Sequence, residues 1–137
     1  MRALIIGSLA SVVACGGDAS GPPTPAPACT PAQAEALVVQ VGAGLEPVFT
    51  WKPRCSISEI RVDYIDPFLL GSPPVVTWRH IGPAVTPPIR YATPDEILPD
   101  LHPPDSLRAG RLYVVRLYQG PDTLGKNVEV AFETFVP

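Results

Sequence analysis

The segment 107–118 limits what this chain can fold into more than any other feature. It reads Leu-Arg-Ala-Gly-Arg-Leu-Tyr-Val-Val-Arg-Leu-Tyr, and it is the longest strand signal in the sequence. After the turn residue Gly110, apolar and β-branched residues continue until Gly120-Pro121. A strand of this kind needs partners, so we read the remaining chain for shorter strands that could pack on it.

Proline and glycine divide the rest of the chain into short pieces. The 137 residues include 19 prolines and 11 glycines, and 46% of the residues are hydrophobic. Proline breaks helix interiors and central strands but suits turns, strand ends and edges. The chain therefore has enough apolar residues for a core, and its frequent prolines and glycines favour many short strands.

The charge pattern excludes one class of partner. The formal net charge is -3 and no basic run is present, so we expect no nucleic-acid surface. Beyond the N-terminal region, no segment is long and apolar enough to span a bilayer.

Alternating apolar and polar residues predict about seven strands. In segment 58–64, Ile60, Val62 and Tyr64 should face the core, while Glu59, Arg61 and Asp63 should face water. In the last strand, Val128, Val130 and Phe132 should point inward and Glu129 and Glu133 outward. No window shows a sustained helical period. The predicted strands are 36–41, 47–51, 58–64, 75–80, 88–91, 107–118 and 127–135, with a further brief piece at 97–98. We predict an all-β sandwich in residues 29–137.

The N-terminus has the form of an export signal. The apolar run from Ala3 to Ala14 is shorter than the roughly 20 residues that span a bilayer. Its end, Val12-Val13-Ala14-Cys15, resembles the lipobox of bacterial lipoproteins. The resemblance implies that residues 1–14 are a signal peptide, that cleavage precedes Cys15, and that Cys15 carries lipid. The alternative is an ordinary signal peptide with an incidental cysteine.

Residues 15–28 form the predicted lipidated cysteine and tether. Gly, Ser, Thr, Ala and Pro dominate this segment, and such a composition cannot bury apolar surface. An extended polyproline conformation at about 3.1 Å per residue reaches roughly 40 Å. Gly16 follows the cysteine where inner-membrane lipoproteins of enteric bacteria carry aspartate, which favours the outer membrane.

The cysteine count predicts one disulfide. With Cys15 acylated, Cys29 and Cys55 remain, and an even remainder in an exported chain suggests that they are bridged. The alternative is two free buried thiols.

Three segments resemble fibronectin type III domains, an immunoglobulin-like sandwich family. Phe49-Thr50-Trp51-Lys52-Pro53 is similar to the family's second strand, Ile60-Arg61-Val62-Asp63-Tyr64 to its third, and Leu107-x-Ala109-Gly110-x-x-Tyr113-x-Val115-x-Leu117 to its tyrosine-corner strand. The resemblance implies that Trp51 fills the core and that the Tyr113 hydroxyl bonds to backbone near Leu107 or Arg108. The chain departs from the family at Ala109, where proline is usual, and in the long segment 92–106.

No catalytic pattern is visible in the sequence. A nucleophile elbow, a phosphate loop and a zinc spacing are all missing, so we expect no enzyme, no cofactor and no metal site. His80 and His102 are interpreted as solvated or hydrogen-bonded histidines. Asp95, Glu96, Asp100 and Asp105 are interpreted as a solvated acidic loop rather than a calcium site.

One sheet face is a candidate binding surface. Four residues should lie outward on one strand, namely Leu112, Val114, Arg116 and Tyr118. Alternatively, this is ordinary surface apolarity or is covered by the segment 92–106. We therefore expect a membrane-anchored, non-catalytic module of the cell envelope that binds an envelope protein or a polysaccharide. The alternative function is a structural accessory subunit of a larger envelope complex.

Overall fold

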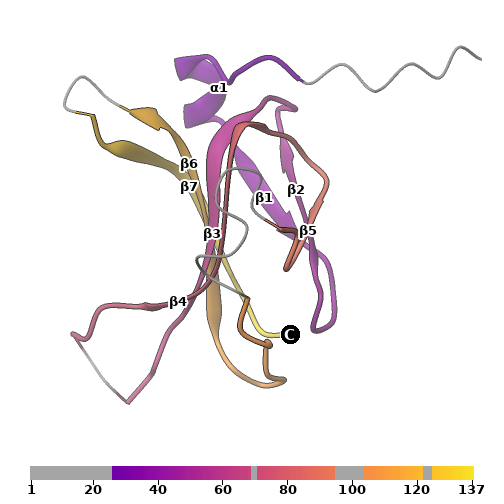
Figure 1. Ribbon diagram of the computed structural model, residues 1–137, viewed down its shortest axis with the longest axis vertical. Coiled ribbons are helices and arrows are strands. Elements are labelled where there is room, and N and C mark those ends of the chain that lie inside the picture. Colours follow the sequence, from indigo (N-terminus) through magenta and orange to yellow (C-terminus); the bar gives the residue numbers. More distant parts are fainter. Residues whose placement is uncertain (1–25, 69–70, 95–103, 122–124) are drawn as a thin grey trace, which may run out of the picture.

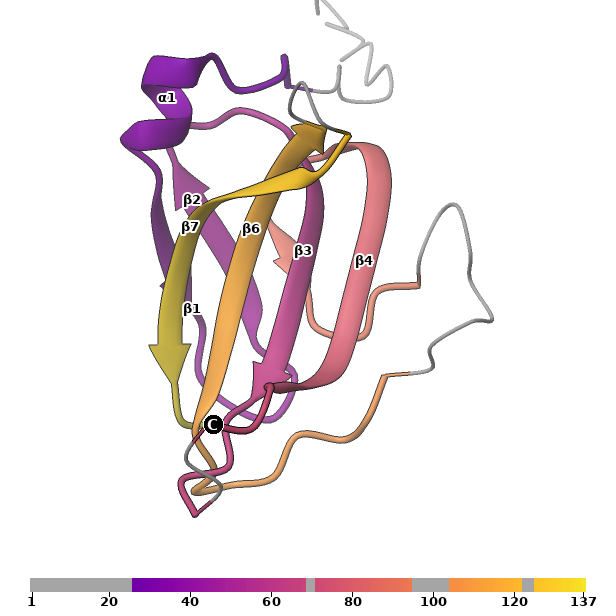
Figure 2. The same ribbon diagram turned by 90° about the vertical axis from the view of Figure 1, so that its left-hand side faces the viewer.

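The computed structural model describes residues 26–68, 71–94, 104–121 and 125–137, and these form two antiparallel sheets that face each other (Figures 1 and 2). The smaller sheet has the order β1-β2-β5 and the larger one β4-β3-β6-β7. The strands are β1 (Val38–Val41), β2 (Val48–Lys52), β3 (Ile57–Tyr64), β4 (Val75–Val85), β5 (Ile89–Arg90), β6 (Tyr113–Pro121) and β7 (Asn127–Phe135). The predicted all-β sandwich is confirmed.

Aromatic residues fill the space between the sheets. Phe49 and Trp51 of β2 are buried, as their shared face predicts, and Phe49 stacks on Trp78 of β4 at 5.9 Å between ring centroids. The Trp51 indole N–H donates to the carbonyl of Cys55 at 2.9 Å. Trp51 is thus a core residue whose polar atom is satisfied.

Tyr113 begins β6 and is 2% exposed. Its hydroxyl accepts a hydrogen bond from the backbone N–H of Arg108 at 3.0 Å. Its ring lies 5.7 Å from the rings of both Tyr64 and Phe135. The predicted bond to the upstream backbone is present, and it holds the segment before β6 against the sheet.

Cys29 and Cys55 form a disulfide with 4.9 Å between their Cα atoms. Beside it, the Ser56 N–H donates to the carbonyl of Pro27 at 2.8 Å, and the Cys29 N–H donates to the carbonyl of Ser56 at 3.1 Å. The hydrogen-bonded part of the chain therefore begins inside segment 15–28, which was predicted to be tether throughout. Cys15 and the predicted signal peptide 1–14 lie outside the described residues.

A short helix, α1 (Pro31–Glu35), was not predicted. Thr30 caps it, because its hydroxyl accepts from the Gln33 N–H at 3.3 Å while the Gln33 side chain accepts from the Thr30 N–H at 2.9 Å. A helix of this length shows no readable apolar period. The capping pair and the proline at the first position were the signals available.

Strand β4 is longer than predicted. We expected it to stop at His80 because Gly82-Pro83 is typical of a turn, yet it continues to Val85. Among the described strands β4 is an edge strand and pairs with β3 alone, so a proline without an N–H is tolerated there. The predicted strand 88–91 contracts to β5, and the predicted piece 97–98 lies outside the described residues.

A β-bulge at Val130 reverses the predicted inward and outward faces of β7 from Ala131 onwards, whereas Val130 itself is partly buried against the core, as predicted. Leu117 pairs with Ala131 but Tyr118 pairs with Glu129, so Val130 is an extra residue. Beyond the bulge, Phe132 pairs with Arg116 and is 62% exposed, whereas we predicted it to point inward. Glu133, predicted outward, lies opposite the core residue Val115 at the sheet edge, and it is exposed there. Val128, also predicted inward, is exposed.

Candidate functional site

One face of the four-stranded sheet has no described layer of structure over it (Figure 2). We call it the open face, and it carries the side chains of Glu59, Arg61, Asp63, Arg79, Val114, Arg116, Tyr118, Glu129 and Phe132. The described parts of the β3–β4 connection, and the ends of β6 and β7 nearest Pro121 and Asn127, project towards this side (Figure 1). It is the face that the sequence singled out for binding.

Two carboxylates on the open face are buried, although both were predicted to face water. Asp63 is 0% exposed and lies beside two arginines that oppose each other across β3 and β6. The Arg61 Nε lies 3.0 Å from Oδ1 and donates to Oδ2 at 3.1 Å, and the Arg116 Nε donates to Oδ2 at 3.2 Å. The side chains of Arg61 and Arg116 remain partly exposed, at 30% and 25%, whereas the Asp63 side chain between them is 0% exposed.

Glu59, which is 3% exposed, is held in the same way. Arg79 of β4 donates to both of its oxygens, at 2.8 and 3.0 Å. Asn127 at the start of β7 donates to Oε2 at 2.7 Å. A carboxylate paired bidentately and bonded a third time is fixed in position, and it fixes Arg79 in turn.

Arg116 links the network to β7. Its Nη1 donates to Glu129 at 2.7 Å, and this hydrogen bond raises the pKa of the Arg116 guanidinium. Arg61 lies over the ring of Tyr118 at 5.2 Å. Burial raises the pKa of the Tyr118 hydroxyl, so Tyr118 is neutral at physiological pH. The open face therefore presents arginines whose positions are set before any partner arrives.

The predicted binding residues do not all reach solvent. Leu112 is exposed and Arg116 and Tyr118 are half-buried, but Val114 is 2% exposed. Val114 lies between Asp63 and Thr134 in the sheet register, so it is not available to a partner. The most exposed apolar residue opposite the β6 positions of this face is Phe132, which sequence reasoning missed because the bulge is not visible in the alternation; Val76, opposite Asp63, is also exposed.

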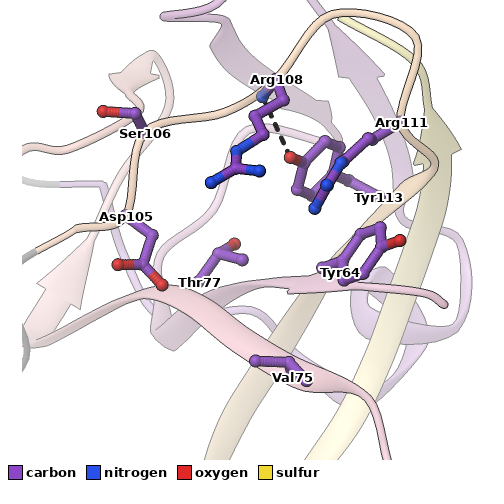
Figure 3. Close-up of a pocket in the computed structure, with 8 residues that line it drawn as sticks. All are labelled: Tyr64, Val75, Thr77, Asp105, Ser106, Arg108, Arg111 and Tyr113. Carbon is purple, nitrogen blue, oxygen red and sulfur yellow. Dashed lines mark hydrogen bonds between the residues drawn. The ribbon is translucent and has the colours of Figure 1, made fainter.

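A pocket of about 400 Å³ lies at the end of the sheet where β3 finishes and β4 begins (Figure 3). Its wall comes from three parts of the chain that are distant in sequence. The residues that line it include Tyr64, Val75, Thr77, Asp105, Arg108, Arg111 and Tyr113. Tyr64 and Tyr113 were predicted as core residues and Asp105 was assigned to an acidic loop, but none of the lining residues was identified as part of a binding site.

A tight turn brings the two pocket arginines together. The Arg111 N–H donates to the carbonyl of Arg108 at 3.3 Å, and Gly110 between them has φ +76°, a left-handed conformation that favours glycine. The Arg111 guanidinium lies 5.0 Å from the centroid of the Tyr64 ring. Both arginine side chains extend into the pocket (Figure 3).

The other side of the pocket is anchored to β4. The Asp105 N–H donates to the carbonyl of Thr77 at 2.9 Å, so this segment follows the edge of the sheet. The Tyr91 hydroxyl donates to the carbonyl of Asp105 at 2.6 Å, and burial raises the pKa of Tyr91 to about 12. The pocket wall is thus held by backbone bonds on both sides.

The histidines and acidic residues form no site in the described chain. His80 was predicted to be solvated or hydrogen-bonded, but it is buried in β4 beside Trp78, and its Nδ1 has no hydrogen-bond partner among described residues. His102, Asp95, Glu96 and Asp100 lie outside the described residues. In the ranges that the structure describes, no group of three metal-ligating side chains occurs. Nor do the same ranges contain a helix with the length and apolarity needed to cross a membrane.

Comparison of the chain with protein-family models, with curated proteins and with solved structures found no match. The case for function therefore depends on the residues and geometry described above.

Proposed function

We propose that this protein is a lipid-anchored, non-catalytic binding module of the bacterial cell envelope. Acylated Cys15 holds the chain to the membrane, preferably the outer one, and the segment that follows separates the sandwich from it. The proposal that the domain is of fibronectin type III type is supported by the buried Trp51 and by the bond between the Arg108 N–H and the Tyr113 hydroxyl.

The open face is the observation that carries the binding proposal. Its arginines are locked by buried carboxylates, so a partner that contacts them loses little side-chain entropy. Arginine and exposed aromatic residues are enriched at binding surfaces, and Phe132 supplies the aromatic ring here. The partner is an envelope protein or a polysaccharide.

Photo-crosslinking in cells tests this surface. A photoreactive residue replaces Phe132, and the matched control replaces Val38, which is equally exposed but lies on the other sheet. We expect an adduct of defined mass from position 132 and none from position 38. Protease digestion of the adduct separates a protein partner from a polysaccharide. No adduct at position 132, or equal adducts at both positions, contradicts the proposal.

The same experiment separates the alternative function. An accessory subunit of a larger complex is expected to stay with its partner at fixed stoichiometry through purification in mild detergent. A binding module is expected to exchange with free partner.

Metabolic labelling with an alkyne analogue of palmitate tests the anchor. Cys15→Ala is expected to abolish labelling and to release the protein from the membrane fraction, because one acylated cysteine is the proposed attachment. The control Cys29→Ala/Cys55→Ala is expected to keep its label. Labelling that persists in Cys15→Ala refutes the lipid assignment.

A further inference from the structure

We infer that the pocket between the β3–β4 end and the turn before β6 binds an acidic saccharide, meaning a sugar unit that carries a carboxylate or a phosphate. This inference concerns a site away from the open face, and it does not depend on the anchor.

The charge in the pocket is available to a ligand. Arg108 and Arg111 line the pocket, and neither makes an ion pair with a carboxylate of the described chain. The arginines of the open face, by contrast, are all paired. A guanidinium offers a planar fork of donors that matches a carboxylate or a phosphate. Two such forks at the ends of one turn point to an anionic group.

The pocket is already shaped before a ligand binds. Arg111 is held over the Tyr64 ring, and the backbone of Arg108 is held by the Tyr113 hydroxyl. That hydroxyl accepts in this bond and donates to no described residue, so its proton can be donated to a ligand oxygen. Substitution of the Arg108 side chain leaves the bond between its N–H and Tyr113 in place, and substitution of the Arg111 side chain leaves the bond between its N–H and the Arg108 carbonyl.

Asp105 decides in favour of a sugar over a simple anion. Its carboxylate shares the pocket with the arginines (Figure 3) and repels a bare anion, but it accepts hydrogen bonds from ligand hydroxyls. The volume of about 400 Å³ also exceeds the needs of a single anion and falls within the range of small-molecule sites, about 300–1,000 Å³. A polyhydroxylated acid can place its acid group against the arginines and donate hydrogen bonds from its hydroxyls to the Asp105 carboxylate.

Calorimetric titration of the full chain in a non-ionic detergent tests the inference with four probes. D-Galacturonate and D-galactose 6-phosphate carry the two acid groups, D-galactose is the neutral match, and acetate is the anion without hydroxyls. We expect at least one acidic sugar to bind about tenfold or more tightly than galactose and than acetate. The stronger of the two acidic sugars identifies the acid group.

Variants assign the binding to this pocket. Arg108→Gln and Arg111→Gln are each expected to weaken binding of the acidic sugar by about tenfold. Arg54→Gln is the matched control, since Arg54 is an exposed arginine outside the pocket. This variant is expected to bind the acidic sugar as tightly as the unmodified chain does. Asp105→Asn is expected to weaken binding of the acidic sugar and to leave the binding of acetate unchanged or tighter.

Several results overturn the inference. Galactose binding as tightly as the stronger acidic sugar removes the role of the acid, and acetate binding as tightly as that sugar removes the role of the sugar hydroxyls. Unchanged affinity in both arginine variants places the binding elsewhere.

Discussion

Replacement of Tyr113 by phenylalanine removes one hydroxyl and leaves the packing of the ring intact. The hydroxyl accepts the Arg108 N–H at 3.0 Å, and the tyrosine is 2% exposed. A typical net hydrogen bond contributes about 0.5–1.5 kcal/mol, and a buried donor left without a partner costs about 1–3 kcal/mol. Arg108 itself is exposed, so water can reach part of its backbone. We therefore expect the free energy of unfolding to fall by about 1–1.5 kcal/mol.

Urea denaturation and thermal melting measure this change. In a small domain, each kcal/mol corresponds to a shift of about 4–8 °C in Tm. Tyr64→Phe is the matched control, because Tyr64 packs against Tyr113 but its hydroxyl donates no hydrogen bond to a described residue. A Tyr113→Phe variant as stable as the unmodified chain, or a loss equal to that of Tyr64→Phe, refutes the role assigned to the bond.

Three further perturbations follow from the structure. Cys29→Ala/Cys55→Ala opens a loop with a sequence separation of 26. The chain-entropy model predicts that the free energy of unfolding falls by about 3.5 kcal/mol, which urea denaturation measures. Free thiols in the non-reduced protein would contradict the bridge. Arg79→Met leaves the buried Glu59 carboxylate without its arginine and is expected to lower the free energy of unfolding by about 3 kcal/mol. Adding Glu59→Gln removes the unpaired charge and is expected to recover part of this loss. No recovery in the double variant argues against an unpaired buried charge as the cause. Burial raises the pKa of Tyr91 to about 12, so the folded state keeps the hydroxyl proton to a higher pH than the unfolded state does. The resulting stability is complete below about pH 10 and falls by about 2–3 kcal/mol at most as the pH rises towards 12. Ultraviolet titration of Tyr91→Phe against the unmodified chain checks this shift.

Features that depend on local pattern were predicted well. Alternation placed Ile60 and Val62 in the core, and the cysteine count identified the bridge between Cys29 and Cys55. Tyr113 was assigned to the core together with its bond to the upstream backbone. These features follow from the side of a strand that a residue occupies, from an even number of available cysteines, or from a contact between residues only a few positions apart.

Burial of the charged residues on the open face was not predicted. Alternation states that Glu59 and Asp63 lie on the side opposite the core, and they do. It does not state that arginines from neighbouring strands cover them, because that depends on cross-strand register. The bulge at Val130 similarly moved Phe132 to the open face through pairing that no local signal marks.

The sequence by itself therefore determined the fold class, the core strands and the disulfide, because strand alternation, turn residues and cysteine parity are local properties of the chain. Only the tertiary structure decided where a ligand could bind. Arg108 and Arg111 face Thr77 and Tyr64 because the segment before β6 hydrogen-bonds to the edge of β4. The segments that line this pocket are distant in sequence, and strand pairing alone sets how close they lie in space, which a linear pattern does not contain.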